Sequence, residues 1–137
     1  MTDLENQADA VSLFLVKHDA LAQQEDAYAR DRITQEGLRI VQEQRVIFTP
    51  KMAWDFYSDK HDAKFAALLR YITAGKSIAM VVCGPECYRK LYALKKEMRG
   101  RFNHGDVNTG THASDDAEGA RRELLLLGIP YWAKRVM

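Results

Sequence analysis

The sequence lacks long hydrophobic runs, and charge of neither sign dominates it. No apolar segment approaches the roughly 20 residues of a membrane-spanning helix. The chain of 137 residues carries 20 basic and 19 acidic side chains, for a formal net charge of +1. That near-neutrality argues against broad binding to duplex nucleic acid, which normally needs a strong basic excess. Residues 1–10 are polar and acidic rather than signal-like, so we expect a flexible N-terminus and a cytoplasmic location.

Cysteine is also scarce, since the chain has only Cys83 and Cys87. Their spacing is compatible with two ligands of a zinc site, but no second Cys/His pair with ligand spacing accompanies them. We therefore predict buried structural thiols in preference to a metal site or a disulfide, and no metal held by protein side chains.

Apolar and polar segments alternate along the chain in a way that predicts a single α/β domain over residues 1–137. Apolar, β-branched runs predict strands over residues 11–17, 38–48 and 77–83. Composition and helical spacing predict helices over residues 20–36, 51–57, 62–73 and 86–98, and from about 115 to 127. The segment from Arg99 to Thr111 is expected to be a loop or a short irregular strand. A ferredoxin-like sheet would need a fourth strand, and only the stretch between Arg99 and His112 has room for it.

One of the four histidines has unusual neighbours. We expect ordinary structural or solvated roles for the other three, which are His18, His61 and His104. His112 lies among small residues just before a predicted helix, and a helix N-terminus offers backbone donors suited to phosphate. Glu123, two to three helical turns further on, is placed to hold one ring nitrogen and leave the other as a nucleophile.

Four motifs in the same order resemble those of nucleoside diphosphate kinases. The segment Thr111–Glu123 is similar to the family's His-Gly-Ser-Asp-Ser signature with its trailing Ala and Glu. The segment Val16–Asp19 resembles the family's Val-Lys-Pro-Asp. Phe56-Tyr57, with Phe65 and Tyr71, resembles the family's tyrosine and aromatic clamp. The segment Arg99–Phe102 resembles Arg-Gly-Asp-Phe. The resemblance spans about residues 11–127.

The resemblance implies a ferredoxin-like fold, with a four-stranded antiparallel sheet and helices packed on it, and a two-step phosphoryl exchange. His112 would take the γ-phosphate of a nucleoside triphosphate and pass it to a nucleoside diphosphate. Lys17 and Arg99 would stabilise the charge on the transferring group. Ser114 and Glu123 would orient His112.

The same resemblance implies the nucleotide contacts. Tyr57 would brace the region of Lys17 and His112 through its hydroxyl, and Phe65 would stack on the base. Thr109 falls where the family has an asparagine that contacts the ribose and phosphates. Mg²⁺ would arrive with the nucleotide phosphates rather than occupy a protein site. The family also implies a homo-oligomer, for which we expect a dimer.

Several positions depart from the family pattern. The family residues Pro, Gly, Gly and Ser are replaced by His18, Ala20, Ala113 and Asp116. A carboxylate at Asp116 would repel phosphate unless it faces away or binds a cation. A family arginine falls on Tyr92, with Arg89 or Lys95 one helical turn away as a possible substitute. The loop that precedes the arginine motif in the family is largely missing.

These departures leave alternatives open. An active phosphotransferase with a shortened nucleotide cleft competes with a catalytically weakened nucleotide- or protein-binding domain, and with a phosphohistidine relay fed by another donor. At the residue level, Lys17 could be a solvated strand end. Tyr57 and Phe65 could be core aromatics, and Arg99 could pair on the surface with Glu97 or Asp106.

Overall fold

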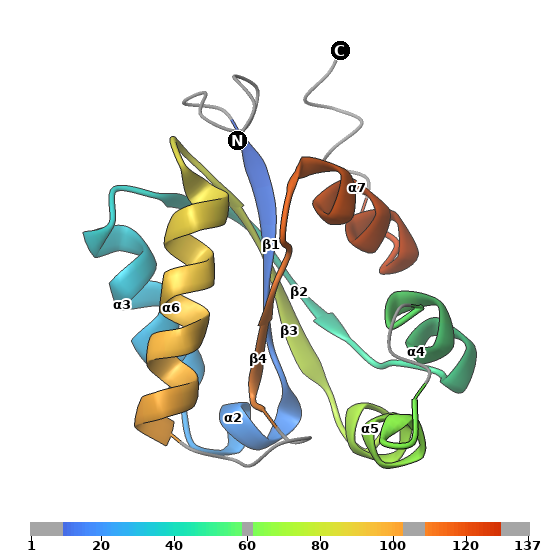
Figure 1. Cartoon of the computed structure of the whole chain (residues 1–137). Helices are drawn as coiled ribbons and strands as arrows, with labels where there is room; N and C mark the ends of the chain where they lie inside the picture. Colours follow the sequence, from blue (N-terminus) through green and yellow to red (C-terminus); the bar gives the residue numbers. More distant parts are fainter. Residues whose placement is uncertain (1–9, 59–61, 103–108, 130–137) are drawn as a thin grey trace.

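A four-stranded antiparallel sheet forms the centre of the molecule (Figure 1) in the computed structural model, which describes residues 10–58, 62–102 and 109–129. The strands lie in the order β2-β3-β1-β4. Their bounds are Val11–Val16 for β1, Arg39–Val46 for β2, Ser77–Cys83 for β3 and Thr111–Ala113 for β4. All neighbouring pairs are antiparallel. This is the strand order of a ferredoxin-like fold, so the predicted fold class is confirmed.

The described part of the chain also forms helices that pack on the sheet. They are α2 (His18–Ala22), α3 (Glu25–Gln35), α4 (Pro50–Phe56), α5 (Phe65–Ile72), α6 (Cys87–Phe102) and α7 (Ala117–Leu126). None of the described helices is long and apolar enough to cross a membrane.

Strand β1 contributes apolar side chains to both faces of the sheet, because successive residues of a strand point to opposite faces. In β1, Phe14 and Val16 belong to the hydrophobic cluster under α3 and α6. Leu13 and Leu15 belong to the cluster under α4, α5 and α7, on the other face (Figure 1). A strand covered on both faces has no polar side, which explains why every residue of β1 is buried.

The start of α4 follows the sequence prediction. Thr49 is the N-cap, and its hydroxyl oxygen accepts a hydrogen bond from the backbone N of Met52 at 3.1 Å. Pro50 occupies the first turn, where its missing N–H leaves no intrahelical bond unmade. The helix ends at Phe56. The rings of Phe56 and Tyr57 lie beside His112 of β4.

Three predicted elements are wrong in detail. The helix predicted over residues 20–36 is two helices, because Gln24 adopts a left-handed backbone with φ 60° between α2 and α3. The helix predicted over residues 86–98 continues to Phe102, so Arg99 lies on a helix and not at the start of a loop. The fourth strand is β4, which contains His112 instead of ending before it.

Candidate active site

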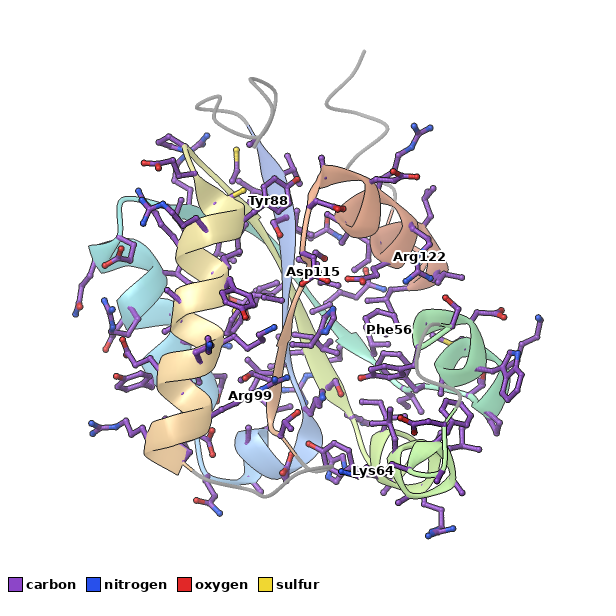
Figure 2. All side chains as sticks on the ribbon, in the orientation of Figure 1. Phe56, Lys64, Tyr88, Arg99, Asp115 and Arg122 are labelled. Carbon is purple, nitrogen blue, oxygen red and sulfur yellow. The ribbon has the colours of Figure 1, made fainter. Side chains whose placement is uncertain are left out.

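A cavity of about 300 Å³ opens beside the edge strand β4. Because it lies at the edge of the sheet, helices from both layers reach it. Lys95 and Arg99 line it from α6, and Arg122 lines it from α7. Figure 2 shows Arg99 on one side of β4, with Phe56 and Arg122 on the other. The edge of the sheet therefore brings together cations from segments far apart in the sequence.

His112 lies on the wall of this cavity, held by one ring nitrogen. On β4 it pairs with Leu15 of β1, and its side chain faces α4 and α7 because neighbouring Ala113 packs in the cluster on the other face. The distance from His112 Nε2 to Glu123 Oε1 is 2.9 Å. The carboxylate accepts a hydrogen bond from Nε2–H, so the lone pair of the neutral ring is on Nδ1.

Burial controls the charge state of this pair. Burial lowers the pKa of His112 and outweighs the hydrogen bond and charge of Glu123, which raise it. The positive charge of Lys17 also lowers it. Burial likewise opposes ionisation of Glu123, but hydrogen bonds from His112 and Ser114 outweigh that effect and lower the pKa of the carboxyl. The resting pair is a neutral imidazole beside a carboxylate.

Ser114 reaches His112 only through Glu123. Its Oγ donates to Glu123 Oε1 at 2.6 Å and is buried. One carboxylate oxygen thus accepts from both side chains, so Ser114 orients the histidine indirectly.

Aromatic rings from the end of α4 pack against the imidazole. The ring centroids of Phe56 and His112 are 5.1 Å apart, and those of Tyr57 and His112 are 6.5 Å apart. The Tyr57 hydroxyl is buried and has no hydrogen-bond partner among the described residues. Burial raises the pKa of this hydroxyl, so it remains a donor.

Arg122 ties this aromatic wall to α7. Its guanidinium donates to the backbone carbonyl of Asp55 at 3.0 Å and to that of Phe56 at 3.2 Å. It also lies 3.7 Å from Glu123 Oε2. Arg122 is not among the predicted site residues, and its only signal in the sequence is its place next to Glu123.

Lys17 is buried behind the cavity, with 2% of its surface exposed, so the alternative of a solvated strand end is wrong. Its Nζ donates to Thr109 Oγ1 at 3.1 Å. The ammonium also lies 5.9 Å from the ring centroid of Tyr57 and 5.6 Å from that of Tyr71. Lys17 does not line the cavity, but its charge acts on the His112 pKa.

Arg99 faces the site and not the surface. Its Nη2 donates to the carbonyl of Thr111 at 2.7 Å, and its Nε is buried without a hydrogen-bond partner among the described residues. Glu97, the predicted surface partner, binds Arg32 instead at 3.0 Å. Asp106, the other predicted partner, lies outside the described residues.

Asp115 and Asp116 bring negative charge to the mouth of the cavity. Asp116 is the N-cap of α7, and its Oδ1 accepts from the backbone N of Gly119 at 2.8 Å. This cap occupies one of the backbone donors predicted to serve a phosphate. Within the described segments, no group of three or more His, Cys, Asp or Glu side chains could hold a metal ion.

Other predicted site residues lie away from the cavity. Phe65 is 8% exposed, packs edge-on against Trp54 at 5.2 Å and is not among the lining residues. His18 Nε2 lies 2.7 Å from the carbonyl oxygen of Tyr71, a structural contact. Both cysteines are buried, as predicted. His61 and His104 lie outside the described residues.

The fold and the cavity together define a class of protein. It is a ferredoxin-like α/β domain whose edge strand carries a carboxylate-held histidine in a cavity lined by Lys95, Arg99 and Arg122, an arrangement suited to phosphate chemistry. Comparison with known proteins is more specific, because the profile of the nucleoside diphosphate kinase family matches residues 10–127. The chain belongs to the nucleoside diphosphate kinase family, as its four motifs predicted.

Individual relatives agree with the family profile. The chain is 30% identical over 128 residues to a nucleoside diphosphate kinase of Mycobacterium avium (strain 104), covering 84% of this chain and 93% of that protein. It is 33% identical over 111 residues to one from Methanosarcina barkeri (strain Fusaro / DSM 804), covering 69% and 71%. The crystal structure of the Aquifex aeolicus nucleoside diphosphate kinase superposes with a TM-score of 0.78 at 26% identity, covering 87% of this chain and 94% of that one.

Proposed function

We propose that this protein is a nucleoside diphosphate kinase that moves a γ-phosphate from a nucleoside triphosphate to a nucleoside diphosphate through phospho-His112. The observation that carries the proposal is the 2.9 Å contact between His112 Nε2 and Glu123, which leaves Nδ1 with the lone pair in a cavity lined by arginines. Burial keeps the imidazole neutral, and only the neutral ring is nucleophilic.

The phosphoryl exchange proceeds in two steps. Nδ1 of His112 attacks the γ-phosphorus, a P–N bond forms, and the bond to the bridging oxygen breaks to release the nucleoside diphosphate. In the second step a terminal oxygen of the acceptor diphosphate attacks the same phosphorus, and the P–N bond breaks. Nε2 keeps its proton throughout and donates it in the hydrogen bond to Glu123, so the phosphorylated ring is an imidazolium whose positive charge the carboxylate stabilises.

The cations around His112 stabilise the negative charge on the transferring group. Arg99 has an unpartnered buried Nε, and an anion would satisfy it. Lys17 contributes charge from behind Tyr57, and the free hydroxyl of Tyr57 is a further donor. These groups are held in place before substrate arrives, which is what makes electrostatic stabilisation effective.

The nucleotide contacts follow from the family. Thr109, already bonded to Lys17, would also meet the ribose or phosphates, and Phe65 would stack on the base after its side chain becomes accessible. Mg²⁺ would enter as part of the magnesium-nucleotide substrate, with its ligands drawn mainly from phosphate oxygens and water. Asp115 and Asp116 are exposed carboxylates that line the cavity and could accept hydrogen bonds from water bound to such an ion.

Radiolabelling tests the proposal. Wild-type protein incubated with γ-labelled ATP and Mg²⁺ should acquire acid-labile phosphate, and unlabelled GDP should remove it as labelled GTP. His112→Asn should bind nucleotide, unfold at a similar temperature and acquire no label. Nucleotide binding without labelling of the wild-type protein would contradict the kinase proposal.

The predicted alternative, a catalytically weakened binding domain, is not favoured, because the family match is accompanied by an assembled His112, Ser114 and Glu123 group. We also propose a cytoplasmic homodimer. Sedimentation equilibrium should give about twice the chain's 15.7 kDa, and a monomer at micromolar concentration would contradict the dimer.

A further inference from the structure

Helix α6 presents cations to the cavity at helical spacing. Lys95 and Arg99 are four residues apart, hence neighbours on one face of the helix, and both line the cavity. This arrangement depends on the uninterrupted course of α6 from Cys87 to Phe102. A break before Arg99 would turn Lys95 away from the face that Arg99 occupies.

Tyr92 holds the Lys95 ammonium over its ring. Lys95 Nζ lies 4.5 Å from the Tyr92 ring centroid, within the range of a cation–π interaction. Tyr92 is 45% exposed and does not line the cavity itself. The neighbouring Lys96 lies 5.4 Å from the same centroid, is exposed and is not a lining residue.

The other candidate cation on α6 points elsewhere. Arg89 Nε lies 3.0 Å from Glu86 Oε1, its side chain is 58% exposed, and it does not line the cavity. Of the three cations one turn from Tyr92, which are Arg89, Lys95 and Lys96, only Lys95 lines the cavity.

The charge of Lys95 also acts on the reacting histidine. It is one of the charges that lower the pKa of His112, behind burial and Lys17. Across the cavity stands Arg122, whose guanidinium is engaged with the end of α4. A polyanion bound next to His112 therefore meets Lys95 and Arg99 on one wall and Arg122 on the other.

We propose that Lys95 binds the phosphate chain of the nucleotide, with Tyr92 as the positioning residue that keeps its ammonium at the cavity wall. The inference rests on the proposed function for its ligand, a nucleoside di- or triphosphate. Lys95 thereby supplies the positive charge that the family arginine at the position of Tyr92 would have supplied. The continuous helix α6 forms the wall of the cavity on this side.

Calorimetric titration of paired lysine variants tests this role. Lys95→Gln should bind ADP and inorganic triphosphate about tenfold more weakly than wild type, as expected for one lost charge-assisted contact. Lys96→Gln, one residue along and off the cavity, should stay within about twofold. Lys95→Arg should recover most of the affinity. Equal affinities for Lys95→Gln and Lys96→Gln would overturn the proposal.

A pH profile distinguishes direct action from mere loss of structure. Removing the Lys95 charge should raise the pKa of His112 and shift the acid limb of labelling to higher pH, whereas Lys96→Gln should leave it in place. Tyr92→Phe should bind nucleotide like wild type, and Tyr92→Leu should lose part of the affinity. Wild-type affinity in Tyr92→Leu would remove the positioning role. Failure of the kinase proposal is a separate result, because it appears in the wild-type labelling and not in the difference between the lysine variants.

Discussion

At the residue scale, the chemistry depends on a contact between side chains from a strand and a helix. His112 and Glu123 are eleven residues apart and meet through a 2.9 Å hydrogen bond. Glu123 is buried, so water competes little for its hydrogen bond to His112. In the proposed mechanism Glu123 holds the ring in one tautomer and orientation, and a variant of the same shape without the carboxylate tests this role.

Glu123→Gln keeps the shape of the side chain and removes the carboxylate. We expect the rate of His112 labelling to fall about 10²-fold, the size of effect seen when a reacting group is misplaced. The acid limb of the rate should also move to lower pH, because the carboxylate raises the pKa of His112. Glu118→Gln, an exposed change in the first turn of the same helix, is the matched control. A shift of the limb to higher pH would contradict this assignment.

The wild-type pH dependence follows from the lowered pKa of His112. Burial depresses it below the ordinary value of about 6.5, so labelling should persist below that pH and fall only through the lower pKa. The same shift affects stability. The folded pKa is below the unfolded one, so the contribution is present above about pH 6.5 and is lost as pH falls through the folded pKa. Rapid-quench labelling between about pH 5 and pH 8 measures the first effect, and a midpoint at or above 6.5 would be inconsistent with a buried neutral ring.

At the scale of elements, α7 is capped at its start and tied to the end of α4 from its middle. Arg122 joins it to the carbonyls at the end of α4, and Asp116 caps its first turn. The two hydrogen bonds of Arg122 fix the position of Phe56 and Tyr57 relative to Glu123. They therefore link two helices that are distant in sequence to the position of one imidazole.

Arg122→Ala should loosen that link. Its guanidinium is 43% exposed, so we expect a modest loss of about 1 kcal/mol in the free energy of unfolding. The labelling rate should fall by more than this destabilisation explains, because Phe56 and Tyr57 lose their tether. Arg121→Ala, the exposed neighbour, should change both quantities little. Chemical denaturation and rapid-quench labelling measure the pair, and equal behaviour of the two variants would exclude a role for the tether.

Asp116 combines a favourable cap with an unfavourable charge at the cavity. Asp116→Ala should lower the free energy of unfolding by about 1 kcal/mol, the usual cost of a lost N-cap. Asp116→Asn retains the cap and removes the charge, so it should keep stability while nucleotide binding tightens several-fold through reduced repulsion. Thermal unfolding and calorimetry separate the two effects. Unchanged affinity in Asp116→Asn would mean that the carboxylate does not act on the phosphates.

At the scale of the whole molecule, the sheet has a core on each face, and the site needs both. Leu91 of α6 and Leu124 of α7 are fully buried in the two different clusters. Either Leu→Ala change should cost about 2–5 kcal/mol and still give a single cooperative unfolding transition, because β1 is shared by both clusters. Two separate transitions in denaturant would show that the layers unfold independently.

Much of the architecture could be predicted from the chain alone. The run of seven apolar or small residues at Ser77–Cys83 is β3 as predicted, since strands buried on both faces are continuous and apolar. The break at Gln24 could not be predicted, because no Gly or Pro marks it and its left-handed backbone is imposed by the packing of α2 and α3. The length of α6 was underestimated because the segment from Arg99 to Thr111 was expected to be a loop or a short irregular strand, yet the helix continues through Gly100 to Phe102.

The sequence by itself determined the family, the ferredoxin-like fold class and the proposal of His112, Glu123 and Ser114 as site residues, because these are carried by local motifs. The tertiary structure decided what faces the cavity. It buried Lys17 behind Tyr57, kept Phe65 in the core, and added Arg122 and Lys95 to the cavity wall. The physical reason is that the cavity lies at the edge strand β4, where helices from both faces of the sheet converge. Which side of each helix meets that edge is set by packing and not by any local pattern.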